Sequence, residues 1–393
     1  MISRIRFINF RSHSDSALAL KPLSLLIGPV AAGKSNVFKG MWAIRNSVHR
    51  TLIELFPPGL GEFRLVRSRW ADETAPLGFE VTIDKLPEFP GQVARYTLKL
   101  ADSPAGIYVL EETLQRETGD GPSQWVFQRR SRAQPLGEFG PVDPYEPTIL
   151  NRVWRSDPRV RHTLPGPMFA RAVAKSMSRF GYYHLEASDL KALGTGEPSR
   201  RIGYNGERLP DFVAWAKSEA PDLYESILKQ MQEVLPGLED ILVTQTQLDR
   251  QGIAMAFQGY RGYIAAPDLS DGTVFTLGLL CIGAAQPRPE VICIEEPEAG
   301  LHPRRLRWLF ERFVELAYPK EGPDGPQVVL STHSPYLVDM FSDMTDAVQV
   351  VEQLDGRTKI SSLDEIQTEK LHRDPHSGEP IGRNWARGLY EGL

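Results

Sequence analysis

The spacing of apolar residues along the chain predicts strands and helices that alternate near both ends. Residues 2–10 have the apolar spacing of a strand, and residues 23–27 form a short apolar run that favours a buried strand. Helical spacing follows this run, with apolar residues at Val37, Met41, Ile44 and Val48. Two further buried strands are predicted at residues 291–294 and 327–331. This pattern indicates an α/β core.

The next hundred residues have the pattern of a β meander. Alternating runs are separated by Gly, Pro and Asp at hairpin-like spacing, at residues 79–83, 96–100, 107–110 and 125–128. Residues 51–68 are interpreted as a linker, because the Pro-Pro-Gly sequence at 57–59 breaks any helix. Residues 131–168 are rich in proline and are interpreted as an irregular loop or a flap.

Helical patterns return in the second half of the chain. Helices are predicted at residues 169–180 and 274–284, with a short strand at 182–185. Pro221 and Pro303 each begin a further helix. The helix from Pro221 carries an apolar stripe that we interpret as core, formed by Tyr224, Ile227, Leu228, Met231, Val234 and Leu235. No heptad pattern persists between residues 36 and 268, which excludes a long coiled-coil arm.

Residues 28–35, Gly-Pro-Val-Ala-Ala-Gly-Lys-Ser, fit the phosphate-binding pattern Gly-x-x-x-x-Gly-Lys-Ser. A strand precedes this loop and a helix follows it, which is the order that phosphate binding requires. We expect Gly28 and Gly33 to shape the loop and Lys34 to reach the terminal phosphates of a nucleotide. The Ser35 hydroxyl is expected to hold Mg²⁺, and Asn36 follows it in the candidate site.

Two adjacent carboxylates, Glu295 and Glu296, end the predicted strand at 291–294. Buried carboxylates are costly unless a cation or a proton requires them. Neighbouring strand residues point to opposite faces, so the two carboxylates are expected to have different roles. Glu295 would face Mg²⁺, directly or through water, and Glu296 would polarise the attacking water.

Two more polar segments flank these carboxylates in the sequence. Ser270 is a good N-cap for the helix at 274–284, and Gly272 would let a phosphate approach the backbone. His333 follows the strand at 327–331, at the carboxyl end where doubly wound sheets bind ligands. Each segment alone is also compatible with a purely structural role.

Composition restricts the class of protein without deciding its function. The chain has 393 residues and a net charge of −5, which gives no overall attraction to nucleic acid or to acidic membranes. Cys281 and Cys293 lie in apolar runs and are expected to be buried reduced thiols. The first residues lack a secretory signal, and no apolar run is long enough to span a bilayer. We therefore expect a cytoplasmic protein with no membrane partner.

The order of these segments resembles the ATPase heads of the RecF, SMC and OLD-like group, and more closely its stand-alone predicted ATPases. The resemblance is carried by the phosphate loop, residues 269–273 (Leu-Ser-Asp-Gly-Thr), 295–298 (Glu-Glu-Pro-Glu) and 331–335 (Ser-Thr-His-Ser-Pro). It covers the first fifty residues and most of 203–345, and it is weak in the β-rich region. It implies an ABC-type ATPase head without a long coiled coil, in the AAA family of ATPases.

The resemblance also implies roles for individual residues. Arg11 and Ser12, in the segment Asn-Phe-Arg-Ser, would contact the base or the phosphates, although a plain turn between two strands explains them equally well. Ser270 and Gly272 would belong to the signature that closes on the ATP of a partner subunit. Glu298 would run along the dimer interface, and His333 would contact the γ-phosphate.

This prediction divides the chain into four parts. Residues 1–60 and 251–393 would form the ATP-binding core, residues 61–168 an inserted β-rich lobe, and residues 169–250 a helical lobe.

One departure from the group is the loop sequence Val-Ala-Ala at 30–32, which lacks a polar side chain and a permissive glycine. Binding is expected to survive this change and hydrolysis to be slow. A nuclease site is not expected, because only about sixty residues follow His333 and they carry no paired acidic residues on a second sheet.

The function predicted from the sequence is an ATPase that binds ATP and Mg²⁺ between two subunits and hydrolyses ATP to switch conformation. Lys34, Glu296 and His333 would carry the catalysis, in a homodimer or a higher assembly of dimers that controls a separately encoded effector. One alternative is a non-hydrolysing ATP sensor of a toxin or phage-defence pair, and only turnover distinguishes it. Another is a DNA-repair head that grips nucleic acid weakly through Arg129, Arg130, Arg132, Arg152, Arg155, Arg159 and Arg161. We interpret these arginines as a solvated surface, because no aromatic residues interleave with them.

Overall fold

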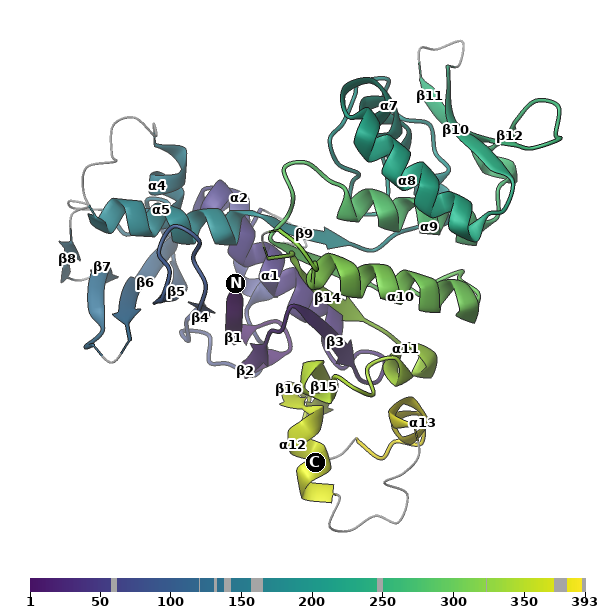
Figure 1. Ribbon diagram of the computed structural model, residues 1–393. Coiled ribbons are helices and arrows are strands. Elements are labelled where there is room, and N and C mark those ends of the chain that lie inside the picture. The colour runs from purple at the N-terminus through teal and green to yellow at the C-terminus, as the bar shows by residue number, and fades with distance from the viewer. Residues whose placement is uncertain are drawn as a thin grey trace. The chain divides into compact units, whose positions relative to one another are not determined.

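The computed structural model describes residues 1–57, 62–119, 121–130, 133–137, 143–156, 165–245, 250–322, 324–370 and 380–390. The chain divides into two compact units, and both are visible in Figure 1. The first unit comprises Met1–Phe180 and Asp343–Leu393, and the second comprises Gly181–Ser342. The division into four parts predicted from the sequence remains a prediction.

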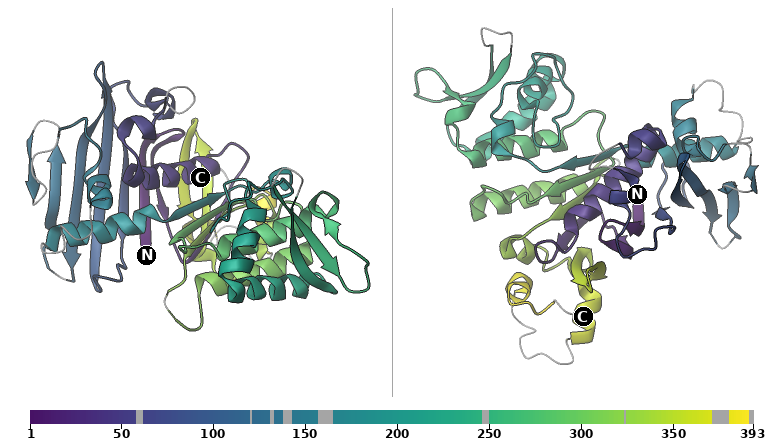
Figure 2. Two further views of the ribbon diagram at one scale, coloured as in Figure 1. Left: turned by 90° about the horizontal axis from the view of Figure 1, so that it is seen from above. Right: turned by 180° about the vertical axis from the view of Figure 1, so that it is seen from behind.

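A seven-stranded antiparallel sheet forms most of the first unit, in the order β2-β1-β4-β5-β6-β7-β8. Figure 2 shows these strands lying side by side. Their bounds are β1 Ile2–Phe10, β2 His13–Ala19, β4 Leu77–Ile83, β5 Gln92–Ser103, β6 Gly106–Thr118, β7 Gln124–Arg130 and β8 Ala133–Gly137. The predicted strand at residues 2–10 and the predicted meander are therefore confirmed, although the meander strands are longer than predicted.

The phosphate-loop region of the first unit is built on a second group of strands. β3 (Leu23–Ile27) is fully buried and pairs in parallel with β15 (Val348–Leu354), which pairs antiparallel with β16 (Arg357–Ser362). α1 (Lys34–His49) begins after the loop that follows β3. The C-terminal helices of this unit are α12 (Leu363–Lys370) and α13 (Ile381–Ala386), and a 3₁₀ turn, η2, covers Thr345–Ala347.

Two stretches interpreted as irregular contain helices. Within 51–68, α2 (Leu52–Leu55) begins with a capping box between Thr51 and Glu54, and α3 (Phe63–Val66) follows. Within 131–168, α4 (Ile149–Arg155) precedes α5 (Pro165–Ser178). The side chain of Thr148 caps α4, and its hydroxyl also donates to the Ser47 carbonyl of α1 at 2.9 Å. The linker and loop predictions were wrong at these helices, because short capped helices leave too few residues to show a period.

The second unit contains a parallel pair of strands with a helical bundle. β13 (Val291–Glu295) pairs in parallel with β14 (Gln327–Ser331), and β9 (Phe180–Tyr183) lies on the other side of β13. A small sheet contains β10 (Leu238–Gln245), β11 (Gln251–Phe257) and β12 (Ile264–Ala265), and a 3₁₀ turn, η1, covers Ala266–Asp268. The helices are α6 Ala187–Leu190, α7 Leu209–Glu219, α8 Pro221–Val234, α9 Asp271–Gly283, α10 Pro303–Ala317 and α11 Pro335–Asp339.

Burial in the second unit follows the predicted patterns. α9 is apolar all round and buried from Gly272 to Ile282, as expected for a helix in the centre of a core. The stripe on α8 faces the core through Tyr224, Ile227 and Met231. Cys281 and Cys293 are free and buried, and burial raises the pKa of both thiols. In the described part of the chain, no helix has the length and apolar character needed to cross a membrane.

Candidate functional site

The loop between β3 and α1 can be formed only with glycine at two positions. Gly28 has φ 148° and Gly33 has φ 113°, where L side chains are strained. A Cβ at Gly28 would lie 1.9 Å from the Val351 carbonyl oxygen, and a Cβ at Gly33 would lie 2.3 Å from Thr358 Oγ1. The two glycines of the predicted phosphate pattern are thus required by the backbone and by its close neighbours.

Ala31 occupies a position in this loop where a glycine would be less costly. Its φ is 66°, in the left-handed region, which costs roughly 1–2 kcal/mol for a residue with a Cβ. As the sequence indicates, this loop lacks a glycine found in related loops. The positive φ of Ala31 shows that this is a position where glycine would adopt the backbone conformation without strain. Val30 beside it is 82% exposed, so its apolar side chain contributes nothing to the core.

Lys34 folds back over the loop that precedes it. Its Nζ donates to the Gly28 carbonyl at 2.7 Å and to the Pro29 carbonyl at 2.9 Å, and the residue is only 7% exposed. The ammonium group is therefore held inside the curve of the loop. A polyphosphate bound there would meet this charge together with the positive end of α1.

The segment that follows β1 is joined to the loop by hydroxyl contacts. Asn36 Nδ2 donates to Ser12 Oγ at 2.8 Å, and Thr358 Oγ1 lies 2.7 Å from Ser12 Oγ and 2.8 Å from the Ala32 carbonyl oxygen. Ser12 and Asn36 are thus brought together as candidate site residues. Arg11 lies in the β1–β2 turn, with φ 51° and its N–H donating to the Val66 carbonyl at 2.7 Å. Sequence reasoning missed Thr358, which no local pattern connects to the loop.

Glu295 and Glu296 have different surroundings in the second unit. Glu295 ends β13 with its side chain 9% exposed, and its Oε1 accepts a hydrogen bond from the Tyr182 hydroxyl. Glu296 has φ 47°, and its side chain is 44% exposed. His333 Nε2 lies 3.9 Å from Glu296 Oε1, so the structure brings these two candidate catalytic side chains together. A buried carboxylate and an exposed one therefore follow each other along the chain.

Glu298 has a contact within the unit that the sequence did not indicate. Its Oε1 accepts from Thr332 Oγ1 at 2.6 Å and from the His333 N–H at 3.0 Å. Thr332 Oγ1 accepts in turn from the Ser334 N–H at 2.9 Å. The carboxylate therefore anchors the backbone of the loop that carries His333. Its predicted place along a dimer interface remains a prediction.

Ser270 and Gly272 lie at the beginning of α9. Ser270 is exposed and is the N-cap, accepting from the Thr273 N–H at 3.3 Å, as expected. Gly272 is buried, and a Cβ there would lie 2.7 Å from the Gly300 carbonyl oxygen. Packing within the unit is thus sufficient to require this glycine. Its expected contact with a phosphate remains a prediction.

The donor set suits a magnesium ion shared with a nucleotide. The described residues contain no group of three or more His, Cys, Asp or Glu side chains that could hold a metal by themselves. Mg²⁺ in nucleotide sites takes one or two protein oxygens, with waters and substrate phosphates completing its shell. The Ser35 hydroxyl in the first unit and the Glu295 carboxylate in the second are oxygen groups of the kind that Mg²⁺ prefers. Their common role in holding the ion remains a prediction.

Four of the seven arginines of the alternative nucleic-acid face lie within the described residues, and three of these four are paired with carboxylates. Arg129 is 2% exposed and pairs with the fully buried Glu112 at 3.4 Å, so neither a nucleic-acid contact nor a solvated surface describes it. Arg130 pairs with Glu111 at 3.6 Å and Arg152 pairs with Glu146 at 3.4 Å. Arg155 is exposed. Arg132, Arg159 and Arg161 lie outside the described residues.

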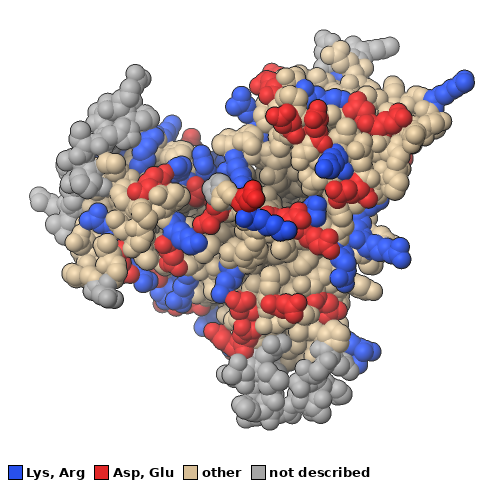
Figure 3. Space-filling model, in the orientation of Figure 1, with Lys and Arg blue, Asp and Glu red and all other residues tan. Residues whose placement is uncertain are grey.

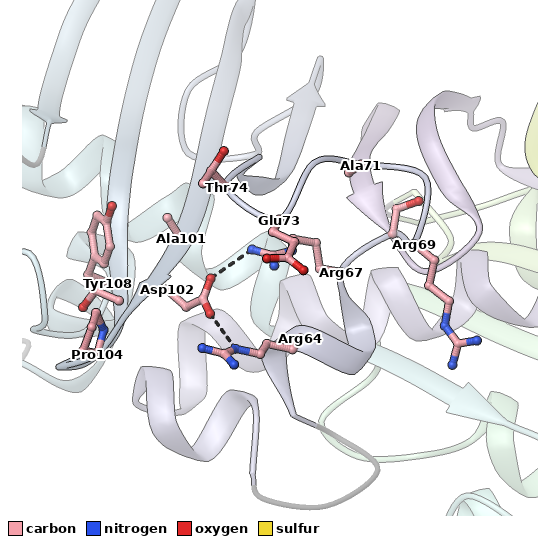
Figure 4. Close-up of a pocket in the computed structure, with 12 residues that line it drawn as sticks. Arg64, Arg67, Arg69, Ala71, Glu73, Thr74, Ala101, Asp102, Pro104 and Tyr108 are labelled. Carbon is pink, nitrogen blue, oxygen red and sulfur yellow. Dashed lines mark hydrogen bonds and ion pairs between the residues drawn. The ribbon is translucent and has the colours of Figure 1, made fainter.

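A cavity of about 620 Å³ in the first unit was not indicated by the sequence. Figure 4 shows Arg64 and Arg67 directed at Asp102 from across the cavity, at 3.0 and 2.9 Å. The same wall is joined to the end of β1, because the Ser68 N–H donates to the Asn9 carbonyl at 2.8 Å. Since both guanidinium groups are already bound to Asp102, we interpret the cavity as a structural junction.

Comparisons with known proteins place this fold in a class. A solved SMC head bound to the C-terminal winged-helix domain of ScpA resembles the chain with a TM-score of 0.52 and 13% identity, over 93% of this chain and 99% of that one. A second SMC head, derived from Pyrococcus furiosus and bound to the C-terminal domain of ScpA, gives a TM-score of 0.48 at 12% identity, over 95% and 99% of the two chains. The chain has the fold of an ABC-type ATPase head without a long coiled coil.

The family follows from the sequence match. Residues 23–339 match the family described as "AAA domain, putative AbiEii toxin, Type IV TA system", and the chain belongs to this family. The OLD nuclease of Thermus scotoductus is 23% identical over an alignment of 389 positions that covers 93% of this chain. The chain covers only 65% of the length of that relative. The resemblance to the RecF, SMC and OLD-like group is thus confirmed.

Proposed function

We propose that this protein binds ATP and Mg²⁺ between two subunits and hydrolyses the ATP to switch between two assembly states. The observation that carries the proposal is the loop at residues 28–33, which has two required glycines, a lysine folded over it and a helix beginning behind it. Such a loop presents backbone donors and a positive helix end to a polyphosphate. Membership in an ATPase family supports the same substrate.

The proposed chemistry divides the work among residues already described. Lys34 would offset charge on the terminal phosphates, and Glu296 would orient and polarise the attacking water. His333, close to Glu296, would stabilise charge that develops on the γ-phosphate. Mg²⁺, held by Ser35 and Glu295, would supply further neutralisation of phosphate charge. The signature at Ser270 and Gly272 would close on the nucleotide of the other subunit.

The output of this cycle would act on another protein. ATP binding would close the dimer and hydrolysis would open it, so a separately encoded effector could be held in one state and released in the other. The description of the family, which includes a toxin system, supports a partner of this kind. A non-hydrolysing sensor would use the same residues, and turnover of ATP is the measurement that separates the two functions.

The first test removes the lysine ammonium. We expect Lys34→Ala to abolish ATP binding in calorimetry, because no other side chain of the loop carries a positive charge. Lys39→Ala is the matched control, since Lys39 is exposed on the same helix. Circular dichroism should show that both variants keep the fold of the parent. The assignment of the phosphate loop is wrong if Lys34→Ala binds ATP as tightly as the parent.

The second test separates catalysis from assembly. We expect Glu296→Gln to lower ATP turnover by a factor on the order of 10²–10⁴, because the amide cannot activate water as a carboxylate does. ATP should remain bound and shift the protein towards a dimer or a higher assembly, measured by light scattering after size exclusion. Adding Ser270→Arg should reverse this shift, because a long side chain would obstruct the signature.

Two results would contradict this function. Parental turnover in Glu296→Gln would remove its catalytic role. An ATP-dependent dimer that persists with Ser270→Arg would exclude closure through the signature and require another P-loop architecture. Absence of turnover in the parent, with ATP bound, would favour the sensor.

A further inference from the structure

Three aromatic side chains are linked to the carboxylate of Glu295 within the second unit, one of them through another. The Tyr182 hydroxyl donates to Glu295 Oε1, and the Tyr204 hydroxyl donates to the Tyr182 hydroxyl at 3.3 Å. His184 Nδ1 lies 3.9 Å from Glu295 Oε2. We name Tyr182, Tyr204 and His184 the aromatic cluster. Its members come from β9 and the segment after it, more than ninety residues before Glu295 in the sequence.

The rings of the aromatic cluster pack against one another. Tyr182 and Tyr204 meet edge to face, with ring centroids 4.8 Å apart and an interplanar angle of 62°. Tyr204 and His184 stack at 6.3 Å with an angle of 26°. The position of the Tyr182 hydroxyl is therefore fixed both by a hydrogen bond and by ring packing.

A carboxylate at the end of a strand can rotate about its side-chain bonds, whereas a magnesium ligand must meet a narrow geometry. Metal-binding side chains are usually oriented by hydrogen-bond partners that do not touch the metal. Tyr182 has this relation to Glu295. Its hydroxyl donates to the carboxylate, and its ring is packed against that of Tyr204.

We propose that Tyr182 is a positioning residue that orients the Glu295 carboxylate for Mg²⁺, and that Tyr204 holds Tyr182 in place. The inference rests on the proposed function, in which Glu295 faces the metal. It adds a residue outside every motif found in the sequence, and it assigns a purpose to the pair of hydroxyl groups that leads to the carboxylate.

The test measures metal dependence of ATP binding by calorimetry. The concentration of free Mg²⁺ that gives half-maximal ATP binding is determined for the parent and for three variants, with a parallel series in EDTA. We expect Tyr182→Phe, which keeps the ring, to raise this concentration by about 10- to 100-fold. Tyr204→Phe should raise it by a smaller factor. Tyr318→Phe, at an exposed tyrosine after α10, should leave it unchanged.

ATP binding in EDTA should be the same in all four proteins, because Tyr182 acts on the metal ligand and not on the phosphate loop. A merely structural tyrosine would weaken binding in EDTA as well, and that result would overturn the proposal. An unchanged Mg²⁺ requirement in Tyr182→Phe would also overturn it. If the parent binds no ATP, or binds it equally with and without Mg²⁺, the proposed function fails instead, independently of the variants.

Discussion

His13 is a titratable side chain at the start of β2 that has no exposed surface. Its Nδ1 lies 2.6 Å from Ser16 Oγ. Burial lowers the pKa of His13 from 6.5 to about 4, because the surroundings disfavour the imidazolium. The folded protein thus holds a neutral histidine over a pH range in which an unfolded chain would protonate it.

This difference predicts a loss of stability in mild acid. The folded pKa lies below the unfolded one, so the contribution of His13 is present above about pH 6.5 and is lost as the pH falls towards 4. We expect urea unfolding to show a decrease of about 2 kcal/mol from this residue between about pH 7.5 and about pH 5. His13→Asn, which keeps a polar group near Ser16 but does not titrate, should remove that part of the pH dependence. An equal pH dependence in both proteins would contradict the assignment.

Single residues differ in how far the sequence could predict them. Gly28, Gly33, Lys34 and Ser35 were predictable because the loop places all its requirements within eight residues. Thr358 and Tyr182 were not, because their contacts with Ala32 and Glu295 span 326 and 113 residues. Hydrogen bonds between distant segments depend on the tertiary fold, and no local period reports them.

Among the elements, helix α4 shows why the Pro-rich stretch was misread. The helix is only seven residues long, and the N–H groups of Ile149 and Leu150 donate to the Glu112 carboxylate of β6 at 2.7 and 3.3 Å. The same carboxylate accepts from the Tyr96 hydroxyl at 3.0 Å and pairs with Arg129. The negative charge at the start of α4 is thus supplied by a strand far from it in the sequence, where no helix rule would find it. The longer helices that begin at Pro221 and Pro303 were predicted at their observed first residues, whereas α7 was not predicted.

This arrangement makes Glu112 a strong determinant of stability in the first unit. We expect Glu112→Ala to lower the free energy of unfolding by about 3–5 kcal/mol, because it leaves the buried Arg129 without its carboxylate. Glu117→Ala is the matched control on the same strand, where an exposed pair with Arg95 is expected to contribute about 1 kcal/mol or less. Urea unfolding curves measure both. A loss for Glu112→Ala no larger than that of the control would show that the buried pair is not stabilising.

At the scale of the molecule, the distribution of charge bears on binding to nucleic acid. On the face shown in Figure 3, basic and acidic side chains are interspersed, in agreement with the net charge of −5. Arg129, Arg130 and Arg152 are each paired with a glutamate, and Arg129 is also buried. The described residues on the face shown in Figure 3 therefore form no continuous basic track for a phosphate backbone.

Binding to DNA is therefore expected to be weak and to depend steeply on salt. Contacts to phosphates alone lose roughly three to five orders of magnitude of affinity between about 50 and about 200 mM salt when six to ten are made. Fluorescence anisotropy with a labelled duplex, at low and at physiological salt, measures this. A nanomolar affinity that persists at physiological salt would contradict the expectation and favour a function in gripping nucleic acid.

The position of Thr358 in the sequence has a consequence for folding during synthesis on the ribosome. The residue that contacts the phosphate loop through Ala32 is made 326 positions after it. At roughly 5–20 residues per second, the ribosome needs roughly 15–65 s to travel that distance. During this interval the nascent chain carries an exposed glycine loop without the strands β15 and β16 that support it. Under the proposed function, the fully supported loop is therefore available to ATP only after Thr358 has been made.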